Sequence, residues 1–356
     1  MIGWYVHHQG AGHLARLQAI AAHLDTPVTA LSTHRAPPDW AGAWVHLERD
    51  DAAVDDPALP ARDVTAHGTL HWAPLHDTGL AERTAQVAAW MARSAPSLVV
   101  VDVSVEISVL ARLAGSRVVV VAMPGERRDP AHRLAYDLAD ALLAPWPEGA
   151  HDAGWPEHWR RKLWAVGGIS RFGDGDTAGP AEADPPTRPS LHPPAGLRRV
   201  LLLWGAGGTD VGAGQVAAAR SATPGWTWVE RSPRDPSPDL RADLESADVV
   251  VTHAGQNAVA DVAALRRPAV VVAQHRPFDE QVATAAAVAR RRAAVGLPCW
   301  PVEAARWPAI LQQALDLGGG WAGWSTGGGA REAARRLDTL AGVGMQRTGP
   351  SLATRA

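Results

Sequence analysis

Short apolar runs alternate with amphipathic helical stretches along the whole chain, and this alternation constrains the fold most strongly. The most apolar runs are strand-sized and span residues 98–103, 118–123, 248–252 and 269–273. Continuous apolar runs of this length are typical of strands that are buried on both faces of a parallel sheet. The alternation therefore predicts an α/β protein in which helices cover both faces of parallel sheets.

A proline-rich stretch divides the pattern into two halves. The chain has 356 residues, more than one hydrophobic core usually serves. Because proline fixes φ and cannot donate a ladder hydrogen bond, we interpret residues 172–197 as an interdomain linker. We predict Rossmann-like, doubly wound domains at 1–171 and 198–329. Residues 330–341 are expected to form a last helix that packs back on the N-terminal domain, and 342–356 a disordered tail.

Composition excludes several functional classes. The formal net charge of -3 leaves no basic excess for a phosphate backbone, so nucleic acid is not expected as a partner. Cys299 is the only cysteine, which excludes an intramolecular disulfide and a cysteine-based zinc site. The start of the chain does not have the pattern of a secretory signal. We expect a cytoplasmic protein, and peripheral contact with the inner face of a membrane stays open.

A glycine-rich turn follows the first predicted strand, residues 2–6. Glycines let the backbone turn sharply and approach a ligand, and open α/β sheets bind ligands at the carboxyl ends of their strands. Ala15 stands where a dinucleotide fingerprint has its third glycine, and no acidic residue ends the second predicted strand near Leu31, which counts against NAD. The alternative is a tight turn with incidental histidines. The candidate site residues here are His8, Gly10, Gly12 and His13.

The second half carries a similar turn and a more specific one. Gly207, Gly208 and Thr209 follow a predicted strand and are candidates to receive a pyrophosphate or a sugar edge, unless they form only a turn. A second turn leads from a strand into a helix, whose N-terminus stabilises phosphate through its free N–H groups and dipole. This turn comprises His253, Ala254, Gly255, Gln256 and Asn257.

Four acidic positions and one amide complete the candidates. Asp261 lies about one turn into the second helix, where it could accept both hydroxyls of a ribose, or be a solvated helix residue. Glu280 and Gln281 could bind sugar hydroxyls, although acids are common at a helix N-terminus. Asp102 and Glu106 follow a strand of the first half as a second candidate base and an acceptor-binding residue, or as a helix N-cap region.

In this order the motifs resemble those of the GT-B glycosyltransferases, and most closely the MurG type that adds N-acetylglucosamine to a lipid-linked muramyl peptide. The resemblance rests mainly on residues 10–13 and 252–281. It implies an N-terminal acceptor domain and a C-terminal nucleotide-sugar domain. It places Gly255 on the phosphate, Asp261 on the ribose and His13 near the reaction centre. Residues 280–281 fall on the family's sugar-reading amide pair, from which Glu280 departs.

We therefore predict transfer of a sugar from an NDP-sugar, with UDP the expected nucleotide, to an acceptor hydroxyl. His13 is the candidate base, because imidazole exchanges protons near neutral pH. No cofactor and no metal are predicted, since no Asp-x-Asp pair follows a strand. The acceptor is left open as a lipid-linked, glycan or small molecule. The alternatives are a nucleotide-sugar 2-epimerase or hydrolase on the same fold, and a nucleotide-binding module without chemistry.

Overall fold

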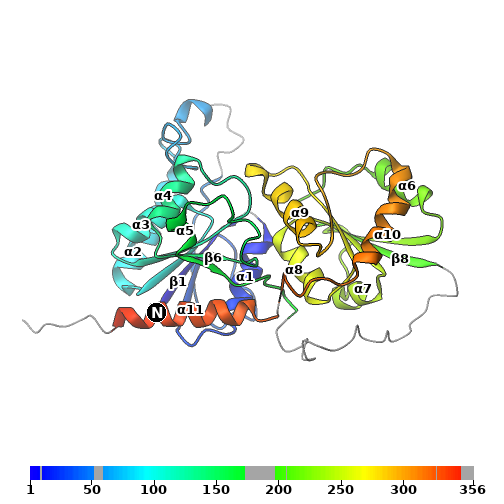
Figure 1. Cartoon of the computed structure of the whole chain (residues 1–356). Coiled ribbons are helices and arrows are strands. Elements are labelled where there is room, and N and C mark those ends of the chain that lie inside the picture. The colour runs from blue at the N-terminus through cyan, green and yellow to red at the C-terminus, as the bar shows by residue number, and fades with distance from the viewer. Residues whose placement is uncertain (9, 52–58, 173–196, 206, 326, 346–356) are drawn as a thin grey trace, which may run out of the picture.

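The protein consists of two α/β domains that lie side by side, each built on one parallel sheet (Figure 1). The computed structural model describes residues 1–8, 10–51, 59–172, 197–205, 207–325 and 327–345. The predicted fold class is confirmed, because every paired strand within both sheets is parallel. Most of the predicted linker and the residues after 345 lie outside the described part of the chain.

The N-terminal sheet has the strand order β3-β2-β1-β4-β5-β6-β7. Its strands are β1 (Ile2–Val6), β2 (Val28–Ser32), β3 (Ala43–His46), β4 (Leu98–Asp102), β5 (Arg117–Val121), β6 (Ala141–Ala144) and β7 (Leu163–Ala165). The order reverses between β1 and β4, where Val6 pairs with Asp102. Such a reversal opens a crevice at the carboxyl ends of the two strands.

Helices cover both faces of this sheet because alternate strand residues point to opposite sides. Val99 and Val101 share a core with α2 (Thr78–Ser94), α3 (Val105–Leu113) and α4 (Pro130–Leu138). Leu98 and Val100 pack on the other side against α1 (Ala11–Ala21) and α11 (Gly329–Met345). The remaining short helices of this domain are η1 (Leu59–Arg62) and α5 (Glu157–Arg160).

The C-terminal sheet has the order β12-β11-β10-β8-β9 and reverses between β8 and β10. Its strands are β8 (Arg198–Leu203), β9 (Trp226–Arg231), β10 (Val249–His253), β11 (Ala269–Val272) and β12 (Val295–Leu297). One face packs on α6 (Ala213–Ala222) and α10 (Trp307–Leu317). The other packs on α7 (Leu240–Ser246), α8 (Gln256–Ala264) and α9 (Glu280–Arg290). The 3-10 helices are η2 (Pro277–Asp279) and η3 (Ala304–Arg306).

Helix α9 begins only at Glu280, because Phe278 and Asp279 before it adopt left-handed φ values of 60° and 53°. The last helix runs to Met345 instead of ending at 341. Among the helices that the structure describes, none combines the length and the apolar character that a membrane span requires.

The last helix, α11, returns from the C-terminal domain and packs on the N-terminal domain (Figure 1). Leu337 is fully buried in the same core cluster as Leu17 and Ile20 of α1. The Asp338 carboxylate also accepts the backbone N–H groups of Asp25 and Thr26, at 3.0 and 2.9 Å. The chain therefore crosses twice between the domains, once through the linker and once before α11.

Leu337→Ala is expected to lower the free energy of unfolding of the N-terminal domain by about 2–5 kcal/mol, because it removes buried apolar atoms and leaves a cavity. Urea denaturation followed by circular dichroism measures this change. Thr339→Ala, exposed on the same helix, is the control and should stay within about 0.5 kcal/mol of the parent. Equal losses in the two variants would contradict the packing of α11 described above.

Candidate active site

A histidine and a buried carboxylate meet at the point where the N-terminal sheet reverses its strand order. Asp102 ends β4 and is fully buried, and His13 lies in the first turn of α1. His13 Nδ1 lies 2.9 Å from Asp102 Oδ1, and Arg16 Nη1 donates to both carboxylate oxygens at 2.8 Å. Burial raises the pKa of Asp102, but the charges of Arg16 and His13 outweigh it and hold that pKa below its ordinary value.

This geometry assigns different roles to two residues that the sequence offered as alternative bases. An ionised Asp102 only accepts hydrogen bonds, so His13 Nδ1 donates to it and Nε2 carries the free lone pair. His13 keeps a side-chain exposure of 14%, whereas the Asp102 side chain has none. Asp102 is thus out of reach of an acceptor and orients His13 instead, which corrects its interpretation as a base acting directly.

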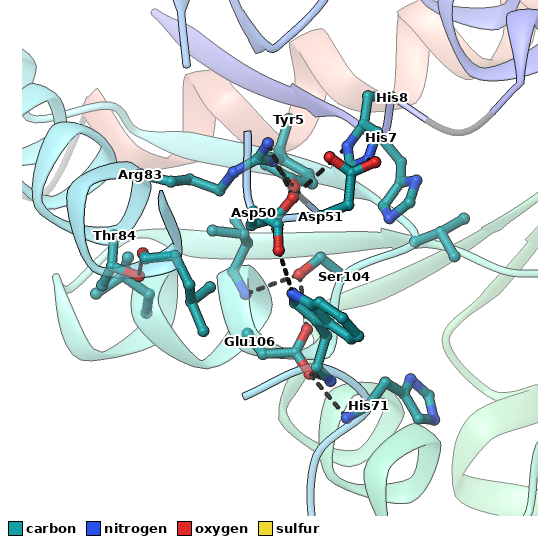
Figure 2. Close-up of a pocket in the computed structure, with 15 residues that line it drawn as sticks. Tyr5, His7, His8, Asp50, Asp51, His71, Arg83, Thr84, Ser104 and Glu106 are labelled. Carbon is teal, nitrogen blue, oxygen red and sulfur yellow. Dashed lines mark hydrogen bonds and ion pairs between the residues drawn. The ribbon is translucent and has the colours of Figure 1, made fainter. Parts of the chain in front are cut away.

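A cavity of about 270 Å³ opens beside this pair, wholly within the N-terminal domain (Figure 2). Its polar lining residues include His7, His8, Asp50, Asp51 and Arg83. Its apolar lining residues include Trp72, Leu80, Val103, Ile107 and Leu110. The His7 ring lies 5.9 Å from the His13 ring, so the cavity reaches the neighbourhood of His13. Of the predicted acceptor-side residues, His8 and Glu106 line the cavity, and Gly10 and Gly12 do not.

Glu106 shapes the cavity by holding its wall. Its Oε1 accepts the backbone N–H groups of His71 and Trp72 at 2.9 and 3.1 Å, and its Oε2 accepts the Ser104 hydroxyl. Val103, which also lines the cavity, has a left-handed φ of 69°. A β-branched residue is strained in that region, and such strain is found at functional sites.

The predicted phosphate turn of the C-terminal domain is built around a neutral histidine. His253 ends β10 and accepts the Gly255 N–H through Nδ1 at 3.0 Å, which leaves the ring proton on Nε2. A Cβ at Gly205 or Gly255 would lie 2.4 or 2.5 Å from this ring, so both positions require glycine. Burial and the nearby charge of Arg276 lower the pKa of His253 to about 4. At neutral pH this side chain therefore offers an uncharged donor.

Arg276 brings a positive charge to the glycine turn that follows β8. Its Nη2 donates to the carbonyls of Gly207 and Gly208. The loop that carries Arg276 also binds Thr209, whose hydroxyl donates to Gln274 Oε1 at 3.0 Å. The turn at 207–209, the loop at 274–276 and the start of α8 thus converge at the crevice between β8 and β10.

Two of the predicted donor-side residues, Gln281 and Glu280, hold loops or domains together through their side chains. Gln281 is buried, and its Oε1 accepts the backbone N–H groups of Ala254 and Gln274 at 3.1 Å, which ties two loops together. Glu280 forms an ion pair with Arg127 of the N-terminal domain at 3.1 Å. These contacts give both residues a structural role in place of the predicted contact with sugar hydroxyls.

Asp261 also differs from its predicted role. It is buried, and both its oxygens are used: Oδ1 accepts from the Ser170 hydroxyl and the Arg171 N–H, and Oδ2 accepts from Arg171 Nε. Burial raises the pKa of this carboxyl, against the charge of Arg171. Asp261 anchors the end of the N-terminal domain to α8, so a ribose would have to displace Arg171.

The two domains touch at the centre of the site and at its outer side. At the centre, Asn257 Nδ2 donates to the Gly12 carbonyl at 3.2 Å, and Arg16 reaches Gln256. At the outer side, the Phe278 ring lies 4.6 Å from the Arg127 guanidinium and 4.7 Å from the His132 ring. These contacts join the predicted acceptor loop to the predicted phosphate turn.

Several of these residues escaped the sequence analysis. Arg16 had a usable signal, because residues three apart on a helix share a face and His13 was already a candidate. Arg83, Arg127 and Arg276 had none, since their partners lie far away in the sequence.

Two clusters among the described residues combine imidazole and carboxylate atoms within 4.8 Å: His8 with Asp50 and Asp51, and His71 with Asp129 and His132. In the first, Arg83 lies 3.1 Å from Asp50 and opposes a second cation. The expectation that no metal is required stays a prediction.

Known proteins resemble this chain in the sequence of its C-terminal domain and in its fold. Residues 236–314 match the glycosyltransferase family 28 C-terminal domain. A search of curated proteins finds no match. Among solved structures, the glycotransferase of kitacinnamycin is 17% identical with a TM-score of 0.61, covering 95% of this chain and 98% of its own. MurG of Acinetobacter baumannii is 14% identical with a TM-score of 0.60, covering 95% and 99%.

The spinosyn rhamnosyltransferase SpnG is similar as well, at 16% identity and a TM-score of 0.60, covering 95% of this chain and 99% of its own. At these identities the likeness establishes the fold, which is that of the GT-B glycosyltransferases. Together with the family match in the C-terminal domain, it supports the prediction that this chain is a glycosyltransferase. MurG and natural-product enzymes match equally well, so the MurG type is not singled out.

Gly125→Ala is expected to separate the domains at their outer contact. Gly125 has φ +92°, and a Cβ there would lie 2.1 Å from the Phe278 carbonyl oxygen. Gly115→Ala is a matched control, since its φ is +82° and its Cβ would meet nothing within 4 Å. Both variants carry the left-handed strain of roughly 1–2 kcal/mol. Only Gly125→Ala should increase the radius of gyration in X-ray scattering, and unchanged scattering would contradict this contact.

Proposed function

We propose that this protein transfers a sugar from a nucleoside-diphosphate sugar, held by the C-terminal domain, to a hydroxyl of an acceptor in the N-terminal cavity. The observation that carries the proposal is the pair of His13 and Asp102, which lies beside the cavity and faces the start of α8. The carboxyl edges of both sheets meet there, as donor and acceptor must. Solved structures of SpnG complexed with thymidine diphosphate and with spinosyn aglycone, each with a TM-score of 0.51, support a nucleotide sugar and an acceptor as the two partners.

The proposed reaction begins with the acceptor hydroxyl. Its proton moves to His13 Nε2 while its oxygen forms the new bond to the anomeric carbon of the sugar. Asp102 stabilises the imidazolium that results, and Arg16 holds Asp102 in place. The bond between the anomeric carbon and the phosphate oxygen breaks, and the nucleoside diphosphate leaves with its electron pair. The proton later passes from His13 to solvent.

Charge on the leaving diphosphate is the main electrostatic problem, and the C-terminal domain offers several donors for it. We propose that the N–H groups at the start of α8 and the Nε2–H of His253 donate to the diphosphate. Arg276 adds a full positive charge beside Gly207 and Gly208. These groups could replace a metal ion, so we propose metal-independent transfer.

Uridine and thymidine diphosphates are both candidates for the nucleotide, the former from the MurG resemblance and the latter from the SpnG complex. The acceptor is proposed to be a compact molecule, or the end of a larger one, because the cavity measures about 270 Å³. The apolar residues that line the cavity suit a carbon skeleton, and the polar residues suit hydroxyl groups.

His13→Ala is expected to lower the rate of glycosyl transfer by about 10²–10⁴-fold, because the general base is lost. The assay follows nucleoside diphosphate release from UDP- and TDP-sugars with a panel of alcohol acceptors. Calorimetric affinity for the free diphosphate should change little, since His13 contacts the acceptor side.

His67→Ala is the control, because its side chain is 93% exposed in the same domain. A His13→Ala rate close to that of the parent would exclude His13 as the base. Stoichiometric epimer formation by the parent without acceptor would instead indicate an epimerase.

A further inference from the structure

Arg16 lies between the proposed base and the proposed donor site. It is 4% exposed and sits on α1, three residues after His13. Its Nη1 holds both oxygens of Asp102, and its Nη2 donates to Gln256 Oε1 of the other domain at 2.8 Å. We propose that Arg16 is a positioning residue that couples occupancy of the donor site to the orientation of the base. This inference rests on the proposed function.

The first half of the coupling runs from Arg16 to His13. Asp102 is fully buried, and its Oδ1 accepts from both the imidazole and the guanidinium. Arg16 Nη1 lies 2.8 Å from both carboxylate oxygens, so this one nitrogen holds the carboxylate in place while Nη2 binds Gln256. Because the His13 ring is aligned by that carboxylate, Arg16 sets the direction in which Nε2 points.

The second half runs from Arg16 to Gln256, the first residue of α8. An arginine only donates hydrogen bonds, so the oxygen of the amide must face it and the amide nitrogen must face elsewhere. That nitrogen, Gln256 Nε2, is buried and makes no hydrogen bond within the described protein. Buried donors without a partner are rare, and each calls for an explanation. A diphosphate oxygen at the start of α8 would supply the missing acceptor.

Both halves of the coupling pass through the planar guanidinium of Arg16, so binding at the donor site can affect the base. With a diphosphate bound, the Gln256 amide is fixed at both ends, and its oxygen then fixes the Arg16 fork against Asp102. With the donor site empty, only the oxygen end of the amide is held. The base therefore becomes fully aligned only after the donor has bound.

A double-mutant cycle tests this coupling. Arg16→Lys keeps the charge but loses the fork, and Gln256→Ala removes the amide. Each single variant is expected to lower kcat about tenfold, and Gln256→Ala should also weaken calorimetric binding of UDP or TDP by about tenfold. If Arg16 and Gln256 act in one chain, the double variant loses little more than the larger single loss.

The matched control pairs Arg16→Lys with Arg127→Lys, which lies at the outer domain contact with Glu280. The losses of that pair should multiply, because the two arginines share no partner. Losses that also multiply for Arg16→Lys with Gln256→Ala would overturn the coupling. So would an unchanged kcat in folded Arg16→Lys, with folding checked by thermal melting.

Arg16→Gln adds a readout that a merely structural role would not move. Without the positive charge, Asp102 stabilises the His13 imidazolium more strongly, so the acid limb of the kcat profile should move to higher pH. The other titratable groups near His13, namely His7 and His34, stay the same in all variants. A lower kcat with an unmoved acid limb would contradict positioning by Arg16.

Assays of the parent protein distinguish a failure of the proposed function from a failure of the coupling alone. If the parent releases no nucleoside diphosphate from any NDP-sugar, the proposed function fails and the coupling fails with it. If the parent is active and the losses multiply, only the coupling is wrong.

Discussion

The buried charge of Asp102 is the constraint on which the rest of this structure depends. A carboxylate without solvent contact is tolerated in a protein only when it is paired and hydrogen-bonded. Both partners, His13 and Arg16, come from α1, so the turn after β1 must carry that helix across the edge of the sheet. Gly10 makes this turn with φ +94°, and α11 covers the outer side of α1.

The same ion pair is also in contact with the second domain, through Arg16. Arg16 extends from Asp102 to the first residue of α8, and Asn257 binds the Gly12 carbonyl beside it. The reversal points of the two sheets therefore face each other across a short distance, with the cavity on one side and the glycine turns on the other. Arg127 and Glu280 join the domains at a second contact. The arrangement brings two binding surfaces to one histidine.

Periodicity predicted the sheets well because strands such as β4 and β10 are dry on both faces and read as unbroken apolar runs. It also predicted where a site would form, since parallel strands end at a common edge. It could not predict which residues pair across the fold. Asp261 was predicted to bind a ribose, but in the structure it accepts a hydrogen bond from Ser170, 91 residues away. Arg16 and Gln256 are separated by 240 residues, and no local pattern links them.

The most direct test of the account is a crystal structure of the protein with bound UDP or TDP. The account predicts the diphosphate between the turn at Gly207–Thr209 and the start of α8, with Gln256 Nε2 donating to a phosphate oxygen and His13 still on Asp102. Arg276 should turn from the Gly207 and Gly208 carbonyls to the phosphates. A nucleotide bound in the N-terminal cavity, or one that leaves the start of α8 untouched, would contradict it.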